Sequence, residues 1–111
     1  YNCAGKTHGN LFSYTETSQL NDLLVGVVDH GTGTAAQISG VTVAGKTGTA
    51  ENATGKDHSW FVGYAPAEDP QVLGIVVIRN PQGIYYGGTI AAPVLRSIYD
   101  NVLPYLGIEK N

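Results

Sequence analysis

The sequence is poor in the features that usually mark a compartment or a partner. Its 111 residues include a single cysteine, Cys3, so an internal disulfide is impossible and cysteine usage indicates no redox compartment. Only 14% of the residues are charged, which excludes an acidic or basic disordered tail. The net charge is -3, and no basic stripe supplies the phosphate contacts that nucleic acid requires. We therefore expect no nucleic-acid partner.

Long apolar runs are also missing. The longest, residues 72–78, is far below the roughly 20 residues that cross a bilayer, and no segment resembles a signal peptide. The sequence thus predicts no membrane span and no targeting segment in this chain, and its length fits one small domain.

Glycine, by contrast, is abundant and unevenly placed. The 15 glycines cluster around 31–33, 45–48 and 87–88, unlike the even spread of a flexible linker. These clusters indicate positions where backbone geometry matters.

The first half of the chain predicts a loop and then a helix. Residues 1–16 show neither the helical nor the strand period of apolar residues. Over about 18–30, by contrast, apolar residues recur at helical spacing. Thr17 or Ser18 is expected to cap this helix, and Gly31 to end it.

The second half predicts three strands and a helix. A short β-branched stretch at 36–38 precedes strands at 41–50, 59–65 and 71–79, and the last of these is apolar on both faces, which is typical of a central strand. A final helix is expected from Thr89, its capping residue, to about Pro104, with Pro93 in the first turn. This order predicts an α+β fold, an antiparallel sheet meander flanked by helices.

Residues 45–51 put a lysine, hydroxyls and glycines into a strand, which core packing does not need. Alternation places Thr47 and Thr49 on one face and Lys46 and Gly48 on the other. An extended peptide could add along this edge, its terminal carboxylate held by the ammonium and the hydroxyls, with the Thr49 amide facing a developing oxyanion.

Two other interpretations of this segment remain open from spacing alone. It could be a solvated edge strand whose lysine and threonines prevent aggregation. It also formally matches a phosphate loop, Gly40-x4-Gly45-Lys46-Thr47, but the residues after Thr47 make a poor helix start and no acidic strand of the required kind follows.

Four blocks of sequence give the segment a family context. They are Gly-Thr-Gly at 31–33, Ala-Gly-Lys-Thr-Gly-Thr-Ala-Glu at 44–51, His-Ser-Trp-Phe-Val-Gly-Tyr-Ala-Pro at 58–66, and Gly-Gly-Thr-Ile-Ala-Ala-Pro-Val at 87–94. Together, and in this order over about 17–104, they resemble the carboxyl-terminal part of a penicillin-binding transpeptidase domain.

The resemblance implies specific roles. In that family a Ser-x-x-Lys helix supplies the nucleophile and its base, a Ser-x-Asn loop assists proton transfer, and a Lys-Thr-Gly strand forms the opposite wall. Lys46, Thr47, Gly48 and Thr49 would bind the carboxylate of a D-Ala-D-Ala stem peptide or a β-lactam, and the Thr49 amide would serve the oxyanion. The resemblance implies no cofactor and places the domain outside the bacterial cytoplasmic membrane.

The nucleophile itself is missing from the sequence. None of the serines begins a Ser-x-x-Lys or a Ser-x-Asn motif; they are Ser13, Ser18, Ser39, Ser59 and Ser97. Since a serine without a positioned base is a poor nucleophile, this chain alone should not acylate. The expected partner is the remaining part of the domain, possibly on another chain; the alternative is a non-catalytic peptide or β-lactam docking module.

The beginning of the chain fits this interpretation. Residues 3–9 resemble the stretch between the nucleophile helix and the Ser-x-Asn loop, so we expect a deletion, or a break in the chain, between about Leu11 and Thr17. Residues 1–16 are then a loop or a remnant of that stretch, and residues 17–111 are the carboxyl-terminal part of the domain.

Three further features favour structural roles. Cys3 and His8, with two histidines elsewhere, make no recognised zinc spacing, so no metal is expected. Trp60 is expected in the core rather than as a sugar platform. Asp57 and His58 would point to opposite faces of a strand and are expected in a surface turn.

Overall fold

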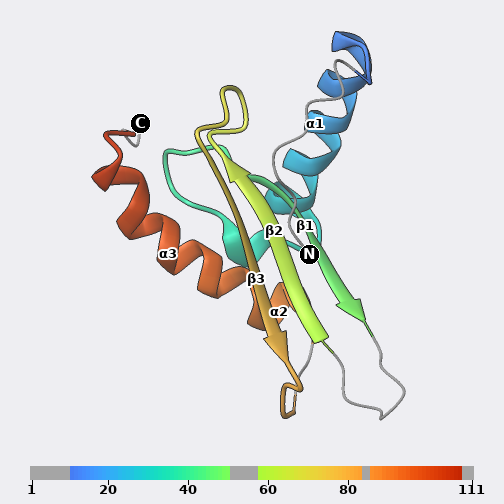
Figure 1. Cartoon of the computed structure of the whole chain (residues 1–111), viewed down its shortest axis with the longest axis vertical. Coiled ribbons are helices and arrows are strands. Elements are labelled where there is room, and N and C mark those ends of the chain that lie inside the picture. The colour runs from blue at the N-terminus through green and yellow to red at the C-terminus, as the bar shows by residue number, and fades with distance from the viewer. Residues whose placement is uncertain (1–10, 51–57, 84–85, 109–111) are drawn as a thin grey trace, which may run out of the picture.

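A three-stranded antiparallel sheet forms the centre of the molecule (Figure 1). The computed structural model describes residues 11–50, 58–83 and 86–108; the loop predicted before residue 11 and the turn predicted at 52–56 lie outside them. The strands β1 (Ala44–Ala50), β2 (His58–Ala65) and β3 (Val72–Arg79) are arranged in the order β1-β2-β3. The helices are α1 (Tyr14–His30), the short 3-10 helix η1 (Thr34–Ala36), α2 (Gly87–Ile90) and α3 (Ala92–Tyr105). The α+β meander predicted from the sequence is confirmed.

The first helix begins earlier than predicted. Ser13, rather than Thr17 or Ser18, caps α1: its hydroxyl accepts from the Glu16 amide at 3.1 Å, and the Glu16 carboxylate accepts from the Ser13 amide at 3.0 Å. The backbone and side-chain hydrogen bonds from Ser13 lower the pKa of Glu16. This reciprocal capping box, Ser-x-x-Glu, satisfies two amides that would otherwise be orphaned. Residues 13–17 therefore form a continuous helix start, and no break in the chain lies there.

Replacing Ser13 with alanine should lower the free energy of unfolding by about 1 kcal/mol, because the N-terminus of α1 loses its cap. Thermal unfolding followed by circular dichroism measures this loss. Ser18→Ala is the matched control: Ser18 lies inside the helix and should be nearly neutral. An equal loss in both variants would contradict the assignment of the cap to Ser13.

The segment between α1 and β1 is not extended as predicted. Thr34–Ala36 form η1, and the only β pairing between η1 and β1 is the isolated bridge from Ile38 to Val41. The strand starts at Ala44 rather than at residue 41. The composition of this segment favours a strand, but packing determines its conformation, since Ala36 and Ile38 are buried against the core.

The prediction that residues 71–79 form the central strand is wrong. The central strand is β2, and β3 forms an edge of the sheet in the described part of the chain. Its alternate side chains Leu73, Ile75 and Val77 are 73%, 64% and 53% exposed. An apolar run shows that both faces of a strand are suited to burial. It does not show whether residues of this chain bury them.

The predicted final helix is divided in two. Thr89 makes no capping hydrogen bond and lies inside α2, while α3 starts after Ala91, with Pro93 in its first turn. Pro93 lacks the amide hydrogen that would continue the helical ladder from α2, which explains the division. Pro104, where the helix was expected to end, lies in the last turn of α3.

The core lies between the sheet and α3. Phe61 on β2 is fully buried, and Leu95, Tyr99 and Leu103 project from α3 at helical spacing. Tyr99 is buried to 2%, and its hydroxyl donates to the Gly63 carbonyl at 2.8 Å. In Figure 1, α3 lies beside β3 and α1 beside β1. The sheet face that carries Phe61 is thus covered.

Replacing Tyr99 with phenylalanine should cost about 1 to 2 kcal/mol of folding free energy, because the buried Gly63 carbonyl loses its donor. Burial raises the pKa of Tyr99 to about 12, an effect that Gly74 partly offsets. The unfolded chain would therefore ionise first, from about pH 10, and stability should fall as pH rises from 10 towards 12.

Urea unfolding between pH 8 and pH 12 tests both points. Tyr99→Phe should be less stable at pH 8 and should show a shallower alkaline decline than the wild type. Tyr105→Phe, at a position 88% exposed, is the control and should match the wild type. An unchanged alkaline decline in Tyr99→Phe would contradict the assignment to Tyr99.

Candidate ligand-binding site

The strand that carries the predicted site lies at an edge of the sheet. β1 pairs with β2 on one side only, so its other side is free of strand pairing in the described structure. An edge strand presents unpaired amides and carbonyls to which an extended chain can add. The first requirement of the peptide-docking hypothesis is met by this topology.

Lys46 and Gly48 lie on the same sheet face as the exposed residues of β3. The register pairs Lys46 with Val62 and Gly48 with Trp60, and these with Ile75 and Val77. Directly opposed residues share a face. We call this surface the open face; it consists of Lys46, Gly48, Trp60, Val62, Tyr64, Leu73, Ile75 and Val77.

Lys46 is exposed and lies at the sheet edge. Its Nζ donates to the carbonyl of Thr47 at 3.0 Å, a contact within its own strand that an incoming carboxylate could replace. Beside it, a Cβ on Gly48 would lie 1.9 Å from two atoms of the Trp60 indole. The indole therefore covers Gly48, and Trp60 is half-buried on the open face; the core position expected for it is taken by Phe61.

Thr47 and Thr49 project to the other side, as alternation predicted. They line a cavity of about 390 Å³ under the start of α2. All of its lining residues are threonines, glycines or a tyrosine: Thr32, Thr34, Thr47, Thr49, Tyr86, Gly87, Gly88 and Thr89. We call it the threonine cavity. It offers hydroxyl groups and no formal charge, with the Lys46 ammonium on the opposite face of β1.

The residues from outside β1 were not predicted as site residues. Thr32 belongs to the turn after α1, and its Oγ1 lies 2.8 Å from the Oγ1 of Thr47. Tyr86 and Thr89 belong to the start of α2. The glycine clusters at 31–33 and 87–88 marked both turns, but no local sequence pattern indicates that they meet β1.

Glycine permits this close meeting of segments. A Cβ on Gly87 would lie 2.3 Å from the Trp60 carbonyl oxygen and 2.7 Å from that of Gly48. A Cβ on Gly88 would lie 2.1 Å from the Thr32 carbonyl oxygen. The start of α2 is therefore packed backbone to backbone against β1, β2 and the turn after α1.

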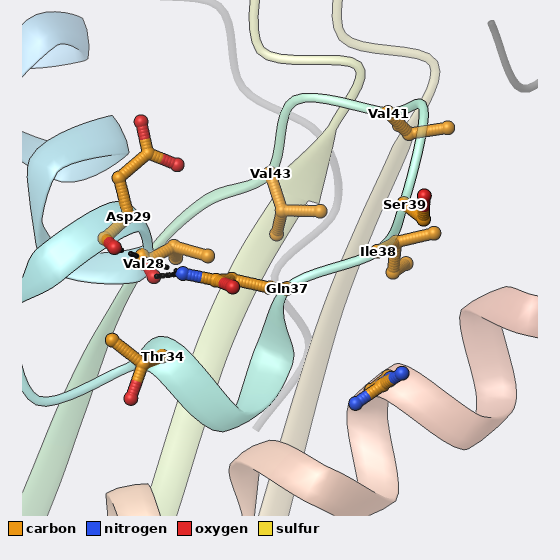
Figure 2. Close-up of a pocket in the computed structure, with 9 residues that line it drawn as sticks. Val28, Asp29, Thr34, Gln37, Ile38, Ser39, Val41 and Val43 are labelled. Carbon is orange, nitrogen blue, oxygen red and sulfur yellow. Dashed lines mark hydrogen bonds between the residues drawn. The ribbon is translucent and has the colours of Figure 1, made fainter.

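A second cavity, of about 460 Å³, is lined by the end of α1, by η1 and by the segment that leads to β1 (Figure 2). The Gln37 amide donates to the carbonyls of Val28 and Asp29 at 3.0 and 2.9 Å, which ties η1 to the end of α1. Thr34 lines both cavities. None of the predicted site residues lines this second cavity, whereas Thr47 and Thr49 both line the threonine cavity.

The described serines have no base positioned to activate them. Ser59 is fully buried on β2, and its hydroxyl has no hydrogen-bond partner in the described structure. The Ser13 hydroxyl serves the helix cap. A serine nucleophile requires a base within hydrogen-bond reach.

His58 is not in a surface turn as predicted. It is the first residue of β2 and is half-buried, with its Nδ1 unpartnered among the described residues. Asp57, its neighbour in the supposed dyad, lies outside the described residues. Within the described ranges, no group of three histidine, cysteine or acidic side chains could hold a metal ion.

Comparison with known proteins places this chain in a family. Residues 4–100 match the model of the penicillin-binding protein transpeptidase domain. The chain belongs to this transpeptidase family. The resemblance carried by the Lys-Thr-Gly strand and its flanking blocks is thereby confirmed.

Individual transpeptidase relatives are moderately similar. The chain is 42% identical over 104 residues to stage V sporulation protein D of Bacillus subtilis, covering 85% of this chain and 16% of that protein. It is 41% identical over 86 residues to peptidoglycan D,D-transpeptidase FtsI of Escherichia coli, covering 71% and 15%. The chain thus spans about a sixth of the length of these relatives.

Solved transpeptidase structures have the same arrangement of elements. The transpeptidase domain of FtsI4 D,D-transpeptidase from Legionella pneumophila matches with a TM-score of 0.79 and 39% identity, over 83% of this chain and 37% of that one. The transpeptidase domain of Burkholderia pseudomallei penicillin-binding protein 3 matches with a TM-score of 0.83 and 32% identity, over 100% and 36%. This chain is therefore part of a transpeptidase domain.

The helices in the described ranges are all too short or too polar to cross a lipid bilayer.

Proposed function

We propose that this chain supplies the ligand-docking wall of a serine D,D-transpeptidase that cross-links peptidoglycan stem peptides and reacts with β-lactams. The observation that carries the proposal is the position of β1: an edge strand with Lys46 on one face and the threonine cavity on the other. The terminal carboxylate of a peptide lying along this edge can be contacted by the Lys46 ammonium from one face and by the threonine hydroxyls from the other.

Each residue has a distinct role in this proposal. The Lys46 ammonium attracts the terminal carboxylate, and the hydroxyls of Thr47 and Thr49 donate to it. The Trp60 indole occupies the space where a Gly48 side chain would lie, so Gly48 would contact the peptide through its backbone alone. The Thr49 amide stabilises the oxyanion that forms when the D-Ala-D-Ala carbonyl is attacked. No cofactor is needed for this chemistry.

The nucleophile comes from the remaining part of the domain, in this proposal. The open face is the surface that would receive it, because exposed Leu73, Ile75 and Val77 lie on the same face as Lys46. Burying this stripe would also cover the edge strand β3. The complete enzyme would act on the extracytoplasmic face of the cell membrane, where its polymeric substrate is assembled.

A non-catalytic docking module is the second candidate. It is favoured by one observation: in the described structure the Ser13 hydroxyl caps a helix and the buried Ser59 hydroxyl has no hydrogen-bond partner, so neither hydroxyl is hydrogen-bonded to a base. The two candidates share the docking strand and differ in whether acylation follows when the missing part is present.

Titration with a peptide ending in D-Ala-D-Ala, followed by amide shifts in NMR spectra, tests the docking site. NMR detects weak binding, which is expected of an incomplete site on an 11.7 kDa chain. The shifts should be saturable and centred on Lys46, Thr47, Gly48 and Thr49. Shifts centred on the second cavity, or none at millimolar peptide, would refute the proposal.

A further inference from the structure

Two threonine hydroxyls in the threonine cavity are in direct contact. Oγ1 of Thr32 and Oγ1 of Thr47 lie 2.8 Å apart, although the residues come from different elements, 15 positions apart in the chain. Either oxygen could donate to the other. We propose that Thr32 is a positioning residue that aims the Thr47 hydroxyl at the ligand carboxylate, an inference that rests on the proposed function.

The backbone of Thr32 is held on both sides, so its hydroxyl is not a loose surface group. The amides of Gly31 and Gly33 both donate to the Val27 carbonyl, at 3.1 and 2.9 Å, which fixes the turn on the end of α1. A Cβ on Gly33 would lie 3.1 Å from the Phe61 ring, so the turn also rests on the core. From the other side, Gly88 packs directly against the Thr32 carbonyl.

Thr47 is held in the same contact. A Cβ on Gly88 would lie 3.4 Å from the Thr47 Cγ2 methyl, so α2 touches both members of the pair. A threonine side chain has few rotamers, and a strand fixes its backbone direction. One hydrogen bond from a rigid neighbour is therefore enough to select the rotamer of Thr47.

The charge of the ligand sets the direction of the hydrogen bonds. A carboxylate only accepts, so a bound carboxylate requires the Thr47 hydroxyl to donate to it. Thr47 then has its oxygen free to accept, and Thr32 must be the donor. The two hydrogen bonds, from Thr32 to Thr47 and from Thr47 to the carboxylate, then point in the same direction. Hydrogen bonds in such a series polarise and strengthen one another. A neutral ester gains less, because hydrogen bonds to ionised groups are about twice as strong.

The test compares a D-Ala-D-Ala peptide with its methyl ester on the wild type and three variants of the whole chain. Thr32→Val should weaken binding of the acid about fivefold and of the ester less than twofold, a loss equivalent to one modest hydrogen bond. Thr32→Ser keeps the hydroxyl and should retain wild-type affinity for both. Thr42→Val, an exposed threonine before β1, controls for the loss of a hydroxyl elsewhere.

A second measurement needs no ligand. Three-bond couplings to Cγ2 report the χ1 rotamer of Thr47, which should be single in the wild type and averaged in Thr32→Val. A single rotamer in both proteins, or equal losses for acid and ester, would overturn the role of Thr32 while leaving the docking site intact. If the rotamer changes but the wild type binds neither peptide, the positioning contact stands and the proposed function fails.

Discussion

Gly87→Ala should lower the free energy of unfolding by about 3 kcal/mol, the upper end of the usual cost of overpacking. The alanine methyl would lie 2.3 Å from the Trp60 carbonyl oxygen and 2.7 Å from the Gly48 carbonyl oxygen. Both obstacles are backbone atoms of paired strands, so neither can rotate away. The start of α2 must move off β1, and the threonine cavity should open with it.

Chemical denaturation measures the loss, and Gly26→Ala provides the matched control. A Cβ on Gly26 would make only ordinary contacts, the nearest at 3.5 Å to the His30 ring. Because Gly26 lies inside α1, alanine there should raise stability by up to about 1 kcal/mol. The two glycine-to-alanine variants should thus change the free energy of unfolding in opposite directions. A neutral Gly87→Ala would contradict the close packing of α2 on the sheet.

Lys46→Met should weaken binding of a D-Ala-D-Ala peptide by about tenfold or more, the usual value of a hydrogen bond to a charged group. Methionine keeps the length and the apolar stem but removes the ammonium. Because Lys46 is exposed and its ammonium, among the described residues, hydrogen-bonds only to the neighbouring Thr47 carbonyl, the fold should be unchanged. The loss should also shrink at high salt, since the attraction at an exposed site is screened.

Arg96→Met is the control for charge. It removes one positive charge from the exposed surface of α3, away from the threonine cavity. Its effect on peptide binding should be small. Equal losses in the two variants would show that overall charge, rather than the Lys46 ammonium, governs binding.

The strand that carries the site was predictable because its signal is local. Period-two alternation placed Thr47 and Thr49 on one face and Lys46 and Gly48 on the other, and the cavity lining agrees. The spacing of apolar residues in α1 predicted a helix, although not its start. The capping box Ser13-x-x-Glu16 was legible in the sequence and would have corrected it.

The other walls of the site depend on tertiary packing, which no local pattern records. Thr32 and Thr47 are in contact only because α1 ends over β1. The sequence indicates Gly87 and Gly88 as turn residues. In the structure they lack side chains because other backbone segments pack directly against them. The prediction that both faces of β3 are covered is wrong for the described part of this chain, since composition does not say which polypeptide buries an apolar face.

Mass spectrometry after incubation with a labelled penicillin tests the central claim, that this chain is a docking wall without a nucleophile. Alone, the chain should keep its mass. Mixed with the Ser-x-x-Lys portion of a related transpeptidase domain, it should promote a covalent adduct on that portion's serine, and the Lys46→Met variant should promote less. A penicillin adduct on this chain alone would contradict the account.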